Sequence, residues 1–535
     1  MKQPYVRPGI DDRPDYEKAL TPEEKSALAR LAVRTRRRPP EASATQAEAQ
    51  ASQLASAGSP ASAAASVDAA VPDLASSFLD MRDPMVALDG ERPTAGQIKR
   101  MKWGFAIAAA LTTVPWIALT MVALPAAAGR ALGFDPATSV APRSTVDDLA
   151  QAAGKVAVPL GIIVALGALA SLLISPFIAA ASDRTRVMIG RRTPWMVAGG
   201  VLSALFALLL GVSGSAGSLG FFWIMLNISY AMLTVPLMAA FGERVPDKQR
   251  VSIVRWQGIG QLVGQVLGAW LGAVCIVFDW YRGGFTPFVC AAVVFAISGI
   301  VIVLVWPREP SSESLPLERF HAEEVWAQLR PPRNAPRFAR MFAARLLMMA
   351  GVGLTGVFLW LIVRYYNTSV TVGETSDAIS SAPLTLGAGI AIAVMALATL
   401  VGAAVAARAA GPINEHYDDV RGPVLGSCVL YFVALVLPMA MPNLAGLALF
   451  ALVAGFAFGV YDALSQTLVM DSLPNPRESG RDLAVFNISN TLGLVVAALL
   501  GAFLTSSFGL FALFPAAMLC VAGAGALVVA AGGAK

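Results

Sequence analysis

Histidine and charge are both scarce in this chain of 535 residues, which holds two histidines and only 14% charged residues. Soluble domains carry roughly a quarter charged residues, so this composition, 56% hydrophobic, excludes an ordinary soluble protein. Both histidines, His321 and His416, fall in polar connecting segments without a nucleophile or a metal-ligand spacing beside them. The sequence therefore predicts no enzyme, no metal site and no cofactor.

Cysteine is also rare, since only four are present and each stands alone in an apolar run. This pattern implies no disulfide framework and is typical of small packing residues. The net charge of +5 does not indicate a nucleic-acid partner, because many of the basic residues precede the apolar part of the chain.

Long apolar runs make up most of the sequence. Each is about 20 residues or longer, which is enough to cross roughly 30 Å of hydrocarbon as a helix. The runs lie near 103–128, 156–180, 194–214, 221–241, 252–278, 284–306, 341–363, 384–407, 422–441, 444–468, 483–506 and 510–531. We expect an all-α integral membrane protein with twelve transmembrane helices in two six-helix pseudo-repeat bundles.

The remaining segments divide the chain into four predicted parts: a disordered tail (1–98), a first bundle (99–306), a polar linker (307–340) and a second bundle (341–535). The tail is rich in Ala, Ser, Gln and Pro, which cannot bury enough apolar surface to fold alone. Within it, we expect a short helix from Thr21 to Arg34, followed by the basic cluster Arg36–Arg38.

Positive charge is distributed unequally between the loops. Loops on one predicted side hold nineteen Lys and Arg residues, and those on the other side hold five. Positive residues in short loops stay in the cytoplasm during insertion, and the tail has no hydrophobic signal region. We therefore expect a cytoplasmic membrane protein with both termini in the cytoplasm.

One charged loop joins the second and third spans and carries Ser182-Asp183-Arg184 followed by Gly190-Arg191-Arg192-Thr193-Pro194-Trp195. This order resembles the signature loop of the major facilitator superfamily, in the form found in its glycoside–pentoside–hexuronide and sucrose-type cation symporters. Phe342–Leu346 and the segment from Asp471 to Asn487 also resemble that branch, while the corresponding loop Gly411–Gly422 is degenerate.

The resemblance implies a gate at this loop. We expect Asp183 to lie against the start of the eleventh span, near Arg481–Ala484, in the outward-open state, because a helix N-terminus favours a carboxylate. The basic residues Arg184, Arg191 and Arg192, with Glu243, are expected to complete this contact.

Polar residues inside apolar spans are costly in lipid and so face other helices or a wet cavity. The fifth span carries Gln257, Gln261 and Gln265 beside a stripe of glycines four residues apart, which favours close helix packing. The other solute-binding candidates are Asn227, Tyr230, Asn487, Asn490, Trp116 and Trp360; Trp223 lies where interfacial anchoring is the better interpretation. Hydrogen bonding between helices is the alternative role of the glutamines.

Asp462 is the one carboxylate well inside a span, and Arg345 lies at a similar depth in the seventh. We expect Arg345 to pair with Asp462, and Asp462 to be protonated in one state and paired in the other. A permanent pair that joins two helices is the alternative.

The leading hypothesis is alternating-access transport of a small polar solute, by resemblance a sugar or glycoside, with proton coupling. Sodium is the alternative ion, although the acids that coordinate sodium in melibiose-type members are missing from the second and fourth spans. The rival hypotheses are drug or metabolite efflux, which favours an apolar cavity, and a sensor that uses the tail. We expect a monomer.

Overall fold

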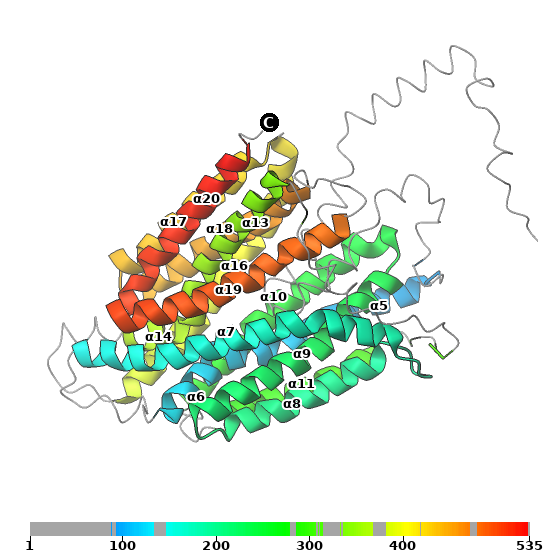
Figure 1. Ribbon diagram of the computed structural model, residues 1–535, viewed down its shortest axis with the longest axis horizontal. Coiled ribbons are helices and arrows are strands. Elements are labelled where there is room, and N and C mark those ends of the chain that lie inside the picture. The colour runs from blue at the N-terminus through cyan, green and yellow to red at the C-terminus, as the bar shows by residue number, and fades with distance from the viewer. Residues whose placement is uncertain are drawn as a thin grey trace, which may run out of the picture. The chain divides into compact units, whose positions relative to one another are not determined.

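The computed structural model describes residues 92–132, 146–278, 285–305, 335–366, 381–417, 419–470 and 479–532, together with Ala87, Glu309, residues 311–313 and Pro332 (Figure 1). All of them belong to one unit of the chain, Gln46–Lys535. The predicted tail helix Thr21–Arg34, the cluster Arg36–Arg38 and most of the predicted linker lie outside the described residues.

The first six spans are helices at the predicted positions, and most extend beyond the predicted limits. They are α5 (Ala95–Ala118), continued by the π-helical turn η2 (Leu119–Ala123) and α6 (Leu124–Ala131), then α7 (Val146–Arg184), α8 (Thr193–Gly211), α9 (Ala216–Arg244), α10 (Asp247–Val277) and α11 (Thr286–Val305). At the start of α5, Thr94 and Gln97 form a capping box, which satisfies two backbone donors that a helix end leaves unpaired.

The second six spans follow the same plan. They are α13 (Pro336–Val357) with the short α14 (Leu359–Leu361) and η3 (Ile362–Tyr366), α16 (Ser381–His416), α17 (Arg421–Ala440), α18 (Leu444–Met470), α19 (Ser479–Phe508), and α20 (Leu513–Gly532) preceded by η5 (Leu510–Ala512). Within the described residues, twelve helices are long and apolar enough to cross a membrane. The predicted all-α class and span count are therefore confirmed.

Helix contacts repeat between the two halves. Helix α5 packs against α10 as α13 packs against α19, α7 against α9 as α16 against α18, and α8 against α11 as α17 against α20. The main contacts between the halves, α7 with α19 and α10 with α16, correspond to each other in the same way. The fold is thus a pair of six-helix pseudo-repeats.

The glycine stripe of α10 lies directly against α5. A Cβ atom built on Gly260 would lie 2.0 Å from the carbonyl oxygen of Ala106, and one on Gly268 would lie 2.5 Å from that of Val114. Such distances exclude any side chain without movement of the backbone, so the glycines allow the two helices to approach closely. This confirms the packing role expected for the stripe.

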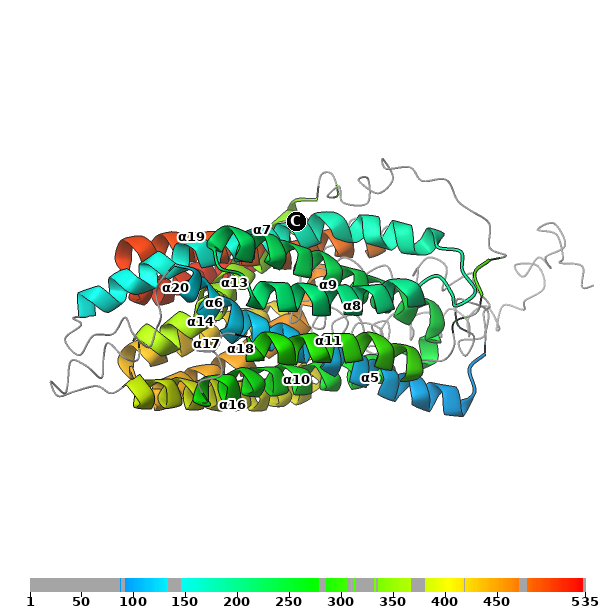
Figure 2. The same cartoon turned by 90° about the horizontal axis from the view of Figure 1, so that it is seen from below.

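The loop 185–192 between α7 and α8 defines what we call the charged end of the bundle, and the other side is the opposite end. Helices α7 and α19 lie side by side (Figures 1 and 2) and touch toward the opposite end, where Cβ on Gly154 would lie 3.2 Å from Ser506 Cα. Nearer the middle, Cβ on Gly161 would lie 2.3 Å from the Ala498 carbonyl oxygen. The two halves are therefore packed together from the middle of the spans to the opposite end.

Candidate functional site

A buried ionic network lies inside the second half, around the guanidinium of Arg345. This arginine of α13 is fully buried, and its Nη2 pairs with Asp462 of α18. Its Nε donates to Asn490 Oδ1 of α19 at 2.8 Å, and its Nη1 donates to Ser465 Oγ at 3.0 Å. The predicted pairing of Arg345 with Asp462 is confirmed, and Asn490 belongs to the same network.

Several polar groups beside this network retain unused hydrogen-bonding capacity. Asn490 Nδ2 donates to Asn487 Oδ1 at 3.4 Å, and the Arg345 guanidinium lies 5.7 Å from the centre of the Tyr461 ring. Within the described part of the chain, the Tyr461 hydroxyl, Asn487 Nδ2 and the Thr491 hydroxyl are buried without a hydrogen-bond partner. An unsatisfied buried polar group costs ~1–3 kcal/mol, so a hydrogen bond from a further polar group to these atoms would be stabilising.

A second charged cluster, which we call the clasp, lies at the charged end and consists of Asp183, Arg191, Arg192 and Glu243. The buried Arg192 guanidinium pairs with Asp183 and with Glu243, the latter at 2.5 Å, and donates to Ser182 Oγ at 3.0 Å. Arg191 pairs with Glu243 at 2.7 Å. Four of the five predicted gating residues are thus brought together within the first half.

Arg184 Nη1 donates to the carbonyl oxygen of Ala180 at 2.8 Å, one turn back along its own helix, and its positive charge lies close enough to act on the Asp183 carboxylate. The contact of Asp183 with the start of α19, expected in the outward-open state, stays a prediction; Arg481 lies outside the residues whose side chains are described.

The sequence did not single out Glu309 and Ser312, which follow α11. The Glu309 carboxylate accepts from the backbone of Arg192 and Thr193, and Ser312 Oγ accepts from the Val187 amide. One signal could have found them: Arg192 precedes α8 and has no side chain that can cap it locally, so the first turn of α8 needs an acceptor from elsewhere.

Aromatic residues fill the centre of the first half. Trp116 stacks on Tyr230 with ring centres 4.4 Å apart and on Trp223 at 5.5 Å. Asn227 Nδ2 donates to the Trp223 carbonyl at 2.9 Å, and all four side chains are buried. Trp223, only 2% exposed, therefore packs inside the protein, which corrects the expectation that it anchors in the lipid interface.

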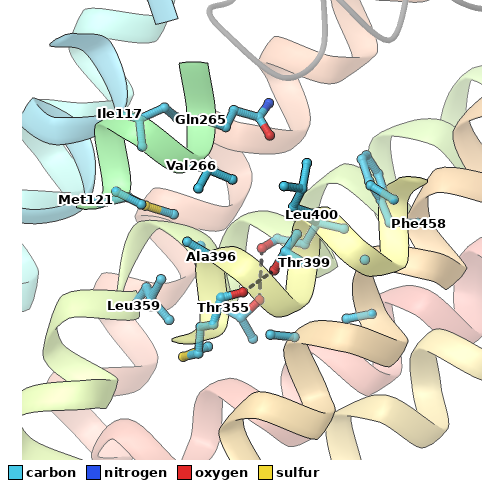
Figure 3. A pocket seen from close by; sticks show the side chains of 18 of the residues that line it. Ile117, Met121, Gln265, Val266, Thr355, Leu359, Ala396, Thr399, Leu400 and Phe458 are labelled. Carbon is cyan, nitrogen blue, oxygen red and sulfur yellow. Dashed lines mark hydrogen bonds between the residues drawn. The ribbon is translucent and has the colours of Figure 1, made fainter. Parts of the chain in front are cut away.

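The candidate solute cavity lies midway along the spans (Figure 3) and measures about 250 Å³. It is lined by α5, η2 and α10 of the first half and by α13, α14, α16, α17 and α18 of the second. Four of its lining residues are polar, namely Gln265, Thr355, Thr399 and Tyr431, and the rest are aliphatic, Met, Phe or Gly. Phe458 lines it, one helical turn along α18 from Asp462 of the ionic network.

The predicted glutamine row divides between two environments. Gln265 lines the cavity, whereas Gln257 Nε2 contacts the Met238 sulfur at 3.4 Å and is 2% exposed. Gln261 is buried as well, and Trp360 is buried near the opposite end. Of the predicted solute-binding residues, the cavity lining thus includes Gln265 and none of the others.

The sequence profile of the Major Facilitator Superfamily matches residues 104–408 and again residues 381–532. The chain therefore belongs to this superfamily and is a transporter, not an enzyme, that moves a small solute by alternating access. No curated protein sequence matches this one significantly.

Solved structures agree with the fold. The nucleoside transporter NupG has a TM-score of 0.59 at 12% identity, over 81% of this chain and 100% of its own. A bacterial homolog of the human lysosomal transporter Spinster, in an inward-facing and unoccupied conformation, has a TM-score of 0.53 at 15% identity, over 82% and 95%. The human organic anion transporter MFSD10 reaches 0.50 at 17% identity, over 81% and 99%. Identities this low show the fold alone.

Proposed function

We propose that this transporter moves a small amphipathic organic solute, with an apolar body and one or two hydrogen-bonding groups, and that Asp462 and Arg345 couple the movement to protons. The charged end faces the cytoplasm in this proposal, in keeping with the distribution of basic residues between loops. The halves touch toward the opposite end, so the structure corresponds to an inward-facing state.

The composition of the cavity wall supports this class of solute. Ile117, Met121, Leu359, Leu400 and Phe458 surround the space, and Gln265 and Thr399 are among the few polar groups on it (Figure 3). Apolar walls with a small number of placed polar groups are typical of sites for drug-like and metabolite-like ligands. Sugars need many hydrogen bonds, because each hydroxyl loses water on binding.

The sugar or glycoside expected from the signature motifs therefore gains no support from this cavity, and the efflux-type hypothesis gains some. The aromatic residues that could stack on a sugar ring, Trp116 and Trp360, are buried away from the lining.

The coupling role follows from the burial of a charged pair. An ionised Asp462 is stable in the bundle only with Arg345 beside it, because an unpaired buried charge is expensive. If the guanidinium moves away, the carboxyl group takes up a proton. Asn490 and Ser465 offer oxygen atoms that already accept from Arg345, so the arginine can leave Asp462 without losing every partner.

A binding panel on the purified protein tests the solute class. We expect chloramphenicol or rhodamine 6G to raise the melting temperature, since a ligand stabilises the state that it binds, while sucrose, melibiose and uridine leave it unchanged. Stabilisation by a sugar and by none of the amphipathic compounds would reject this proposal in favour of the sugar hypothesis.

Asp462→Asn in proteoliposomes tests the coupling. With the compound that binds in the panel, we expect this variant to lose accumulation driven by a pH gradient while it keeps binding and solute exchange. If pH-driven accumulation persists in Asp462→Asn, the pair only joins two helices. If a sodium gradient drives the native protein and a pH gradient does not, proton coupling is wrong.

A further inference from the structure

The segment after α11 binds the loop at the charged end through a side-chain cap on α8. The Glu309 carboxylate accepts from the backbone amides of Arg192 at 3.1 Å and Thr193 at 2.9 Å, and from the Thr193 hydroxyl at 2.9 Å. The first amides of a helix have no partner within it, and their positive end favours a carboxylate. Glu309 therefore supplies, from 117 positions along the chain, the cap that Arg192 cannot provide.

Ser312 adds a second attachment, three residues after Glu309. Its hydroxyl accepts from the Val187 amide at 3.1 Å and lies 3.1 Å from the Thr185 carbonyl oxygen, and its own amide donates to the Val187 carbonyl at 3.3 Å. Glu309 and Ser312 thus bind both ends of the loop. We call residues 309–312 the strap.

Gly190 shows how closely the strap fits. Its φ of +92° is in the region that favours glycine, and a Cβ atom there would lie 2.3 Å from the Glu309 carboxylate. Any other residue at this position would both strain the backbone and displace Glu309. The glycine of the Gly-Arg-Arg sequence therefore allows the backbone turn and also leaves room for the Glu309 side chain.

The strap and the clasp meet at one residue, Arg192. Glu309 binds its backbone amide, while its guanidinium joins Asp183, Glu243 and Ser182. A guanidinium that holds three oxygen partners at once needs a fixed backbone, because each partner constrains its position. Glu309 thereby determines where the clasp forms.

We propose that Glu309 is a positioning residue for the cytoplasmic gate, because it fixes the backbone from which Arg192 reaches Asp183 and Glu243. When Glu309 releases α8, Arg192 loses its orientation and the inner closure weakens. This inference rests on the proposed gating role of Asp183 and Arg192.

The test compares Glu309→Ala, Glu309→Gln and Ser312→Ala with Glu313→Ala, a control at an exposed position directly after Ser312. Spin labels replace Lys248 and Tyr417, exposed residues at the charged ends of the two halves, in a chain whose four native cysteines are alanine. Loss of a helix cap typically costs ~1 kcal/mol. Only the part of this cost that is larger for the closed gate than for the open one shifts the equilibrium, so we expect the ratio of long to short distances to rise by at most about fivefold for Glu309→Ala. Ser312→Ala and Glu309→Gln are expected to give smaller increases, and Glu313→Ala none.

Hydrogen exchange checks that the strap itself was released. The amides of residues 187, 192 and 193 should exchange faster in Glu309→Ala and not in Glu313→Ala. Faster exchange with an unchanged distance distribution would mean that Glu309 is only a helix cap, and the inference would be wrong.

Asp183→Asn, measured with the same labels, separates this inference from the proposed gate. If Asp183→Asn shifts the distances and the Glu309 variants do not, the gate stands and the strap has no part in it. If neither shifts them, both proposals fail. If only the Glu309 variants shift them, Glu309 does not act through the clasp.

Discussion

The two halves share one plan of helices but place their polar groups at different depths. In the first half, charge gathers at the end of the bundle, where the buried Arg192 joins Asp183 and Glu243, and the centre is an aromatic stack. In the second half, the described part of the corresponding loop carries the exposed pair Asp419 and Arg421 at 3.7 Å. Its ionic network lies in the centre instead.

This difference indicates a division of labour within a duplicated fold. The halves need two kinds of ionic contact, one that opens and closes an end and one that senses a bound ion or solute. An end contact can be partly hydrated and is therefore weak and reversible, whereas a central contact is dry and strongly tied to protonation. Under the proposed function, the first half carries the former and the second half the latter.

The largest expected effect is the loss of the central arginine. Arg345→Met leaves Asp462 buried without its cation, which typically costs ~3–5 kcal/mol, so we expect a markedly lower melting temperature and poor yield. Arg192→Met should cost less, because its partners Asp183 and Glu243 are 48% and 26% exposed at the side chain. Thermal unfolding in detergent measures both.

The double variant Arg345→Met with Asp462→Leu controls for this result. Replacing a buried ion pair with apolar residues of similar volume is often neutral or stabilising, so the double variant should recover most of the stability while transport stays lost. Equal losses for Arg345→Met and Arg192→Met would remove the distinction between a dry centre and a hydrated end.

Helix packing gives a second contrast, between two faces of α10 in the first half. Gly260 of α10 leaves no room for a Cβ atom beside Ala106. Gly258 lies two residues earlier on the same helix, and a Cβ atom there would have nothing within 4 Å. Overpacking typically costs ~1–3 kcal/mol, so Gly260→Ala should lower the melting temperature and Gly258→Ala should leave it nearly unchanged. If neither substitution lowers the melting temperature, α5 and α10 are packed less closely than the structure shows.

Much of this arrangement could be predicted from the sequence. Twelve apolar runs predict twelve helices, because the membrane leaves an uninterrupted helix as the way to satisfy the backbone. The pair of Arg345 and Asp462 was predictable too, because an unpaired charge inside a membrane span is costly and these two opposite charges lie at similar depth.

Other features depend on contacts that no local pattern records. Glu309 caps a helix from 117 positions away, and its own neighbours, Arg308 and Pro310, do not suggest such a role. Three glutamines four residues apart predict one shared helix face with one environment. In the structure, Gln257 contacts Met238 instead, and Gln265 lines the cavity. Trp223 lies at a membrane-edge position along the chain but turns inward to Trp116, because only the tertiary structure decides which side of a helix meets lipid.

The cavity offers a third test, since its wall joins the two halves. Gln265→Leu removes a polar group from the lining, and the loss of one buried hydrogen bond typically costs ~1–3 kcal/mol, roughly a 5- to 150-fold loss of affinity. We expect this loss in equilibrium binding of the compound found in the panel. Gln257→Leu, outside the lining, serves as the matched control, and a larger effect there would place the solute against Met238.

The smallest expected effect belongs to Asp183. Its side chain is 48% exposed, and partly exposed ion pairs contribute ~0.2–1 kcal/mol, which shifts a two-state ratio by at most about fivefold. If the antiparallel register of α7 and α19 continues toward the charged end when the gate closes, it would bring Asp183 opposite the start of α19, where we expect a carboxylate to stabilise the closed gate. Asp183→Asn should therefore raise the fraction of inward-open molecules, seen as longer distances between labels at Lys248 and Tyr417, and slow turnover without loss of solute affinity. Asp419→Asn, in the corresponding loop of the second half, should change neither quantity. If the two substitutions act alike, the end contact is not confined to the first half, and the asymmetry between the repeats would have to lie in the centre alone.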